Sequence, residues 1–362
     1  MKVGLQIIFQ NHGNLISDGQ MVAEELHIAE LAEPLGFDEI WPVEHHFTDY
    51  SSCPDNMQLL SYLAAKTSTI KLATGAVILP WNHPLRVAEK MILLDHLSGG
   101  RAIFGMGRGL ARREYAGFGI EMEESRDRFD EAAAMILGAL ETGVMEAHEG
   151  KYYQQARTEI RPAPRGSFSD RLYAVAMSPD SVLQAAKLGA NMVLFSSRPD
   201  EMVKEAIDAY GVEFRKHHNR TPSPTRFCDF MICDESADRA RELALQHIAG
   251  YFVSVMGHYE LTGQHFKDSK AYSSYGEAVD MLRELGLEDM SQAYVDCQSW
   301  GTPQMILDRL ERRRAVVGDF ELSVCAKFSG TSLDVAEKSM RLFATDVLPT
   351  LKNDVGTTAA AS

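Results

Sequence analysis

Apolar runs of strand length alternate along the chain with segments whose apolar positions recur every three or four residues. The apolar runs are closed by Gly, Pro, Asn or charged residues, a pattern typical of buried parallel strands, and the intervening periodicity predicts amphipathic helices. We expect strands at 3–9, 39–43, 70–80, 101–106, 172–176, 191–195, 226–233 and 322–327. We expect helices at 20–35, 58–65, 85–97, 126–140, 181–188, 199–210, 237–251 and 333–342.

Repeated strand and helix units with short links predict a parallel sheet covered by helices. Because eight strands are the number that closes a barrel, the predicted fold is α/β, a (β/α)8 TIM barrel. An open doubly wound sheet is the alternative, but no Gly-x-Gly-x-x-Gly follows the first strand. Residues 252–300, approximately, interrupt the alternation and predict an insertion over the barrel mouth before the last strand. We therefore expect one domain at 1–350 and a flexible tail at 351–362.

Composition narrows the possible partners. A formal net charge of −15 argues against a broad surface for nucleic acid or an anionic membrane. The five cysteines are scattered without a Cys-x-x-Cys pair, which favours a reducing compartment over a disulfide framework. The chain offers neither a signal peptide nor the ~20 consecutive apolar residues of a membrane helix. We expect a cytoplasmic protein.

Titratable residues follow the second predicted strand, which ends in Glu44-His45-His46. In an α/β barrel, the carboxyl ends of the strands form the rim where the chemistry is done. Adjacent residues on an extended chain face opposite sides, so one histidine is expected to point inward and the other to be structural. Taken alone, a hydrogen-bonded structural pair is the commoner arrangement; the functional interpretation makes His45 a general acid or base and Glu44 its orienting partner. No metal site is expected, because neighbouring histidines rarely share an ion and spacing supplies no third ligand.

Two turns suited to anions follow the fourth and fifth predicted strands. Gly107-Arg108 allows close backbone approach and provides a fork-shaped donor, and Arg126 heads the next helix as a second cation. Ser178 and Ser181 stand at a helix start, where N-capping is the structural alternative to binding an anion. Because these strands are neighbours, both turns should lie at the barrel end that carries His45.

The third predicted strand contains two residues with little or no side chain. Gly75 and Ala76 stand within it, between Thr74 and Val77. Such residues in a buried strand either admit another packing layer or leave room for a flat ligand. Packing is the commoner reason.

Several motifs, taken in order, resemble the bacterial luciferase-like flavin monooxygenases, and most closely the luciferase α subunit. The resemblance extends to residue 349 and excludes the insertion. The motifs are Phe37-Asp-x-x-Trp-x-x-Glu44-His45-His46-Phe-Thr48, Thr74-Gly-Ala-Val-Ile-Leu-Pro80 with His83-Pro84, Leu94-Asp-x-Leu-Ser98, Gly105-x-x-Arg108-Gly109 and Gly301-Thr302-Pro303.

The resemblance implies a (β/α)8 barrel that binds reduced FMN (FMNH2) supplied by a separate NAD(P)H:flavin reductase. In that family, O2 adds at C4a of the flavin, and the resulting C4a-peroxyflavin oxygenates a small hydrophobic substrate. It also implies a homodimer.

The resemblance assigns roles residue by residue. His45 matches the catalytic histidine, Arg108 and Arg126 match arginines on the FMN phosphate, and Ser178 and Ser181 match hydroxyl positions there. Ala76 falls beside the isoalloxazine ring, where the family often has a non-proline cis peptide. The full set expected to contact the cofactor is Ala76, Gly107, Arg108, Arg126, Val175, Met177, Ser178 and Ser181.

Four positions depart from luciferase. Its reactive cysteine is Gly107 here, a tyrosine is Ala111, an aspartate is Glu114, and an acidic residue beside the phosphate serine is Met177. Since these positions surround the oxygenated flavin, we expect oxygenation without light emission. A deazaflavin (F420)-dependent oxidoreductase that transfers hydride, or a non-catalytic flavin-binding protein, are the alternatives.

Overall fold

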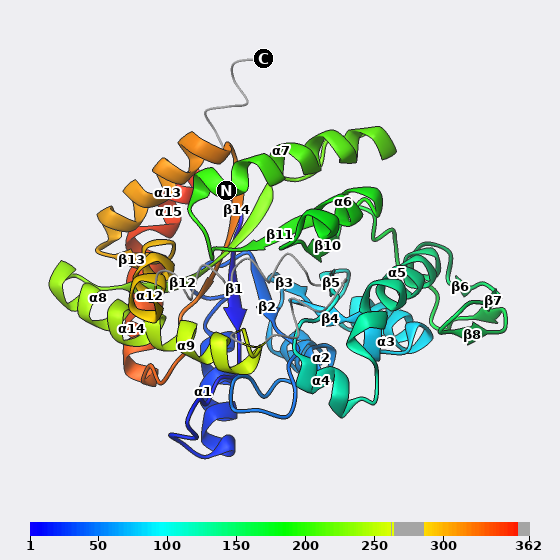
Figure 1. The fold of residues 1–362 in the computed structure, drawn as a ribbon, viewed down its shortest axis with the longest axis horizontal. Coiled ribbons are helices and arrows are strands. Elements are labelled where there is room, and N and C mark those ends of the chain that lie inside the picture. The colour runs from blue at the N-terminus through cyan, green and yellow to red at the C-terminus, as the bar shows by residue number, and fades with distance from the viewer. Residues whose placement is uncertain (262, 264–285, 354–362) are drawn as a thin grey trace.

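Eight parallel strands close into a barrel in the computed structural model, which describes residues 1–261, 263 and 286–353. Each strand pairs in parallel with the next, β12 pairs with β14, and β14 pairs with β1 to complete the ring (Figure 1). The predicted (β/α)8 barrel is confirmed. Its strands are β1 (Val3–Ile7), β2 (Glu39–Pro42), β3 (Lys71–Ala73), β5 (Ala102–Gly107), β10 (Leu172–Val175), β11 (Asn191–Phe195), β12 (Thr225–Cys233) and β14 (Phe320–Cys325).

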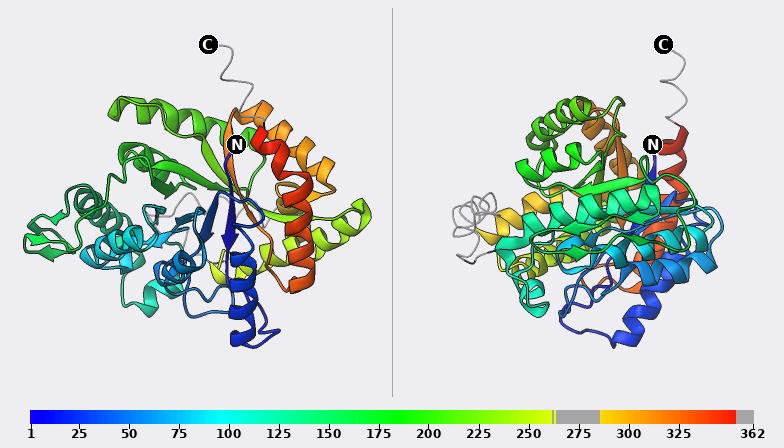
Figure 2. Two further views of the ribbon diagram at one scale, coloured as in Figure 1. Left: turned by 180° about the vertical axis from the view of Figure 1, so that it is seen from behind. Right: turned by 90° about the vertical axis from the view of Figure 1, so that its right-hand side faces the viewer.

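Helices surround the strands in every view (Figures 1 and 2). They are α1 (Asp18–Glu30), α2 (Asn56–Lys66), α3 (Pro84–Leu97), α4 (Arg112–Gly117), α5 (Ser125–Thr142), α6 (Pro179–Lys187), α7 (Asp200–His217), α8 (Ala237–Leu243), α9 (Ala249–His258), α12 (Leu287–Asp296), α13 (Pro303–Val317), α14 (Leu333–Asp346) and α15 (Leu348–Asn353). Several begin at residues whose side chains cap them, such as Asp55 before α2, Ser178 before α6 and Ser332 before α14. Within the described residues, no helix has the length and apolar character needed to cross a membrane.

The third strand differs from its prediction. Instead of one strand over 70–80, the chain forms β3, then a break at residues 74–76, then the short strand β4 (Val77–Ile78) and a 3-10 turn, Leu79–Trp81. The regular ladder stops here: the backbone N–H of Thr74 still donates to the carbonyl of Ile103 at 3.1 Å, but the Thr74 hydroxyl accepts from the amide of Gly105 at 2.8 Å and donates to the carbonyl of Gly105 at 2.7 Å. The peptide bond between Gly75 and Ala76 is cis, at the position where the resemblance implied one. Gly75 and Ala76 therefore lie at the end of a strand and not inside one.

Other segments were missed or misjudged. The helix expected at 237–251 continues through a π-helical segment, Ala244–Ile248, into α9 and ends at His258. Helices α4 and α13 were not predicted, although Thr302 and Pro303 are a helix start signal for α13. Nor were two small antiparallel pairs, β6 (Val144–Met145) with β9 (Thr158–Glu159) and β7 (His148–Glu149) with β8 (Gln154–Gln155), which stand beyond α5 at the edge of the molecule (Figure 1).

The expected tail starts inside a helix. Residues 351–353, expected in the tail, form the end of α15, where Leu351 is buried. Residues 354–362 of that tail lie outside the described part of the chain, as do 262 and 264–285 of the expected insertion. The described part of the expected insertion contains most of α9 and all of α12, and these two helices contact each other.

Buried charges fill the amino-terminal end of the barrel. Arg226 of β12 is fully buried, and its guanidinium lies 2.5 Å from the carboxylate of Glu39 and 2.6 Å from that of Glu321. The same guanidinium packs against the rings of Trp41 and Tyr173. This network occupies the interior at one end, so space for a ligand is left toward the carboxyl ends of the strands.

Candidate active site

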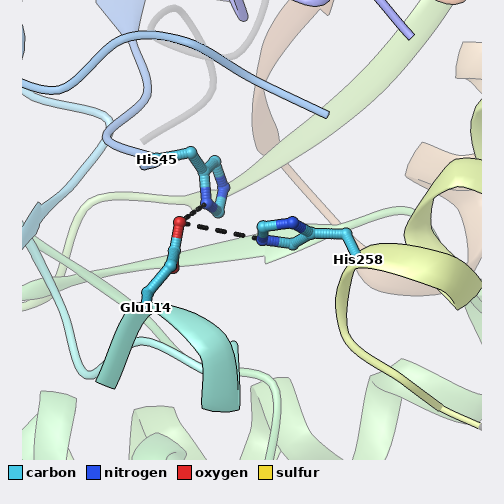
Figure 3. A group of neighbouring side chains, drawn as sticks. All are labelled: His45, Glu114 and His258. Carbon is cyan, nitrogen blue, oxygen red and sulfur yellow. Dashed lines mark hydrogen bonds and ion pairs between the residues drawn. The ribbon is translucent and has the colours of Figure 1, made fainter. Parts of the chain in front are cut away.

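His45 and Glu114 meet at the carboxyl end of β2. The Nδ1 atom of His45 lies 3.0 Å from Oε1 of Glu114, which comes from α4 (Figure 3). The same oxygen accepts the backbone N–H of His46 at 2.8 Å. Glu114 is buried, whereas the His45 side chain keeps 16% of its surface exposed. Because a carboxylate can only accept, this contact places a hydrogen on Nδ1 and leaves Nε2 of His45 as the acceptor.

The end of α9 lies over this pair. His258 points its Nε2 atom at the same Glu114 oxygen, at 3.7 Å (Figure 3). Its Nδ1 atom lies 3.1 Å from the hydroxyl of Thr48. Tyr259 places its hydroxyl 3.4 Å from Nε2 of His45. Burial, together with the nearby His45 and Arg113, lowers the pKa of His258 to about 2. His258 is therefore a neutral imidazole at neutral pH.

Sequence reasoning did not include Glu114, His258 or Tyr259 in the site. Glu114 was noted only as a departure from luciferase, and the other two follow a π-helical segment that no sequence pattern predicted. They reach His45 because α4 and α9 approach each other: Arg112 forms a bidentate ion pair with Glu260, at 3.0 and 2.8 Å. That contact joins segments that are far apart in the sequence.

The expectation that Glu44 orients His45 is wrong. Within the described residues, the Glu44 carboxylate accepts from the indole N–H of Trp81 at 2.7 Å, from the amide of Asn82 at 2.9 Å and from the backbone of Ile78 at 3.1 Å. It also lies 3.3 Å from Nε2 of His46. Glu44 and His46 thus hold the turn after β4, and Glu114 takes the place beside His45.

An apolar hollow lies inside the barrel next to β2. Its cavity volume is about 10 Å3, room for about one water molecule, so it is far smaller than the usual ligand pocket. Ala76 and Val175, both expected to contact a cofactor, border this space. Trp41 and Tyr173 border it as well, with their rings edge to face at 5.1 Å. Since Trp41 is part of β2, the hollow adjoins the strand that leads to His45.

Gly107 and Met177 lie beside this hollow. A Cβ atom on Gly107 would come within 2.9 Å of the Cδ1 atom of Ile78 and 3.5 Å of the Ala76 side chain. A methyl group at position 107 would therefore displace the end of the Ile78 side chain and make an ordinary contact with Ala76, which lines the hollow. The sulfur of Met177 accepts the backbone N–H of Phe195 at 3.2 Å, so Met177 is turned toward the end of β11.

The two turns suited to anions lie near each other. Strands β5 and β10 pair directly, as expected from their order. Ser178 and Ser181 form a capping box at the start of α6, with the Ser178 amide donating to the Ser181 hydroxyl at 2.9 Å. Arg126 reaches the same helix start through an ion pair with Asp180, at 3.0 Å. Both serines are thus engaged in capping, with their hydroxyls at the positive end of the helix.

Arg108 belongs to the same region. Burial raises the pKa of Asp130, and the positive charges of Arg126 and Arg108 oppose this rise. Both guanidinium groups therefore lie within electrostatic range of one carboxyl group. The structure brings Arg108, Arg126 and the start of α6 into one cationic corner.

Comparisons with known proteins identify the family of the chain. The profile of the family described as luciferase-like monooxygenase matches residues 1–319. The alkanal monooxygenase alpha chain of Photorhabdus luminescens is 25% identical over 343 residues, covering 93% of this chain and 94% of its own. The limonene 1,2-monooxygenase of Rhodococcus erythropolis is also 25% identical, over 92% of this chain and 83% of its own.

Solved structures share the fold over nearly their full length. A monooxygenase from Streptomyces bottropensis superposes with a TM-score of 0.80 and 26% identity, covering 97% of this chain and all of its own. The oxygenating constituent of 3,6-diketocamphane monooxygenase from Pseudomonas putida, solved with FMN, has a TM-score of 0.76 and 19% identity over 96% and 98%. An F420-dependent reductase from Methanopyrus kandleri has the same fold at a TM-score of 0.67 and 21% identity over 96% and 99%. The chain belongs to the luciferase-like monooxygenase family and is an oxidoreductase of that family.

Proposed function

We propose that this enzyme is the oxygenating component of a two-component flavin monooxygenase. It would use FMNH2, delivered by a separate NAD(P)H:flavin reductase, and O2 to oxygenate a small hydrophobic substrate. The observation that carries the proposal is the His45 imidazole, held through Nδ1 by the buried Glu114 at the end of the strand that borders the apolar hollow. A flavin enzyme of this family needs such an acid or base beside a site that keeps water out.

The residues present fit FMN. The hollow has an apolar lining with two aromatic rings, Trp41 and Tyr173, which is the chemistry that suits a planar ring system, but at about 10 Å3 it would have to widen before a flavin ring could enter. Arg108, Arg126 and the start of α6 form the cationic corner, which suits a phosphate group. Reduced FMN bound there would supply the electrons that activate O2, a reaction for which side chains alone are unsuited.

His45 would move the proton of the reaction at its Nε2 atom. Since Glu114 fixes the hydrogen on Nδ1, Nε2 carries the lone pair and can accept a proton from the substrate side. When it does so, the Glu114 carboxylate stabilises the imidazolium that forms, and His258 stays neutral beside it. Tyr259 is the side chain that approaches Nε2 from α9, so a substrate would have to share this position with it.

The proposal does not include light emission. Gly107 stands where luciferase has its reactive cysteine, and it lies against the wall that contains Ala76. We extend the proposal to a cytoplasmic homodimer. Light scattering on the purified protein would test whether it is a dimer.

Isotope labelling tests the function. The protein is mixed with NADH, FMN and a flavin reductase under 18O2, with a panel of aldehydes, cyclic ketones and aromatic compounds. One labelled oxygen atom in a product, formed only when the protein, FMN and the reductase are all present, is the expected result. O2-independent hydride transfer with reduced F420, and no labelled product with FMN, would instead support the F420-dependent alternative, whose members share this fold.

A further inference from the structure

Three ligand-type side chains meet near the carboxyl end of β2, from three separate elements. The Nδ1 atom of His45, Oε1 of Glu114 and Nε2 of His258 all lie within 4.8 Å of one another (Figure 3). The Glu114 oxygen is 3.0 Å from the first nitrogen and 3.7 Å from the second. In a tetrahedral zinc site, bonds of about 2.0 to 2.2 Å place neighbouring ligand atoms about 3.4 Å apart. The two measured separations bracket that value.

Both histidines also have an oxygen partner on the nitrogen that would face away from a metal. His258 contacts the Thr48 hydroxyl through Nδ1 at 3.1 Å, and His45 contacts the Tyr259 hydroxyl through Nε2 at 3.4 Å. Histidines that bind metals almost always donate their other N–H to an oxygen in this way, which fixes the tautomer and the ring orientation. The arrangement therefore includes the outer contacts of a metal site as well as its ligands.

One nitrogen of His258 is buried without a hydrogen bond to any residue that the structure describes. Its Nε2 atom is buried, and within the described residues it has no hydrogen-bond partner, since 3.7 Å to Glu114 is too long for one. Burial of such an atom costs free energy unless something occupies its lone pair or its hydrogen.

We propose that His45, Glu114 and His258 form a binding site for Zn2+, and that the ion inhibits the enzyme by occupying His45. The imidazole of His45 then carries its hydrogen on Nε2, facing Tyr259, and that nitrogen no longer accepts a proton. His46 takes no part, because its Nε2 atom lies beside Glu44. Inhibition rests on the function proposed above, whereas binding of the ion does not.

Titration of the untagged protein with Co2+, a spectroscopic substitute for Zn2+, tests the site without any turnover. We expect one equivalent to produce the visible absorption of tetrahedral cobalt, and Zn2+ to displace it. His258→Gln and Glu114→Gln should each weaken binding by more than the roughly 10 to 100-fold that loss of an outer contact costs. His12→Gln, which changes a half-exposed surface histidine, is the matched control and should bind as the wild type does.

Thr48→Val separates loss of the site from loss of the fold, since it keeps all three ligand atoms and removes the hydroxyl beside His258. Binding should weaken about tenfold, with an unchanged thermal melt by circular dichroism. An absorption band that persists with wild-type affinity in His258→Gln, or the lack of any saturable band in the wild type, would overturn the proposal. Failure of cobalt binding leaves the 18O2 experiment unaffected, so the two proposals fail separately.

Discussion

The Glu114 carboxylate lies 3.0 Å from Nδ1 of His45 and accepts the His46 amide through the same oxygen. Both hydrogen bonds end on one buried atom, so the strand end and the imidazole are positioned together. The Glu114 carboxylate therefore both positions the His45 imidazole and places a negative charge beside it.

Replacement of Glu114 by Gln separates charge from position. Its carbonyl oxygen can still accept from Nδ1 and from the backbone, but it no longer stabilises the imidazolium. We expect kcat/KM to fall by about 10 to 100-fold, a part of the roughly 100 to 10,000-fold that general acid–base catalysis contributes. FMN affinity, measured by fluorescence quenching, should stay near the wild-type value.

Glu123→Gln, which changes an exposed carboxylate, controls for loss of one negative charge and should leave turnover unchanged. Wild-type turnover in Glu114→Gln would remove the carboxylate from the mechanism. A loss of turnover that is matched by an equal loss of FMN binding would instead indicate a structural role.

Arg126 is predicted to bind the cofactor phosphate in competition with Asp180, its ion-pair partner. Arg126→Ala should weaken FMN binding by about 10 to 100-fold, since a hydrogen bond to a charged group contributes roughly 1.5 to 3 kcal/mol. Riboflavin, which lacks the phosphate, should bind the variant and the wild type equally well. Asp180→Ala should strengthen FMN binding by releasing the guanidinium. Parallel losses for FMN and riboflavin would contradict this assignment.

The sequence predicted the barrel because its signal is local. Buried parallel strands are continuous apolar runs, and helices repeat every three to four residues, so eight units could be counted without any knowledge of contacts. The third strand was the exception. At its break the Thr74 hydroxyl bonds the backbone of Gly105 on a neighbouring strand, and no pattern within 70–80 contains that information.

The site was predictable only where its residues follow strands. His45, Arg108 and Ser178 come directly after strand ends, so the topology alone places them at one end of the barrel. Glu114, His258 and Tyr259 belong to helices whose approach is fixed by packing and by the ion pair between Arg112 and Glu260. The sequence places Glu44 next to His45, but the Glu44 carboxylate accepts hydrogen bonds from the indole of Trp81 and the amide of Asn82 instead.

We predict that position 107 needs a glycine because a side chain there would collide with Ile78, and not because of the backbone conformation. A Cβ atom there would lie 2.9 Å from Cδ1 of Ile78. Gly107→Ala should destabilise the protein by up to about 1 kcal/mol, because Cδ1 is the end of a flexible side chain that can turn aside, and should weaken FMN binding. Adding Ile78→Val, which removes that terminal methyl group, should restore most of both losses. Urea unfolding and FMN titration of the two single variants and the double variant measure the coupling, and strict additivity would argue against this contact as the cause.

Glu25 is predicted to make the fold less stable as pH rises. It lies fully buried on α1, where burial outweighs the attraction of Lys327 and raises its pKa from 4.5 to about 8. No hydrogen bond of good geometry reaches either carboxyl oxygen within the described residues, and the nearby backbone groups of Phe9 and Gln10 only partly oppose the rise in pKa. Between these two pH values the unfolded chain has released the proton that the folded chain still holds, so the free energy of unfolding falls with rising pH.

Removal of this titration should therefore stabilise the protein on the alkaline side. Glu25→Gln keeps the shape and the neutral form, so its advantage over the wild type should be small at pH 5 and grow to a few kcal/mol by pH 8, at about 1.4 kcal/mol per pH unit at most. Thermal melts at pH 5, 6, 7 and 8 measure the difference.

Glu33 is a suitable control, because backbone N–H groups of Ile70, Thr69 and Ser68 outweigh desolvation and lower its pKa to about 2. It is ionised throughout this range, so Glu33→Gln should shift the melting temperature by the same amount at every pH. Parallel curves for Glu25→Gln and the wild type would show that the buried carboxyl group does not titrate in this range.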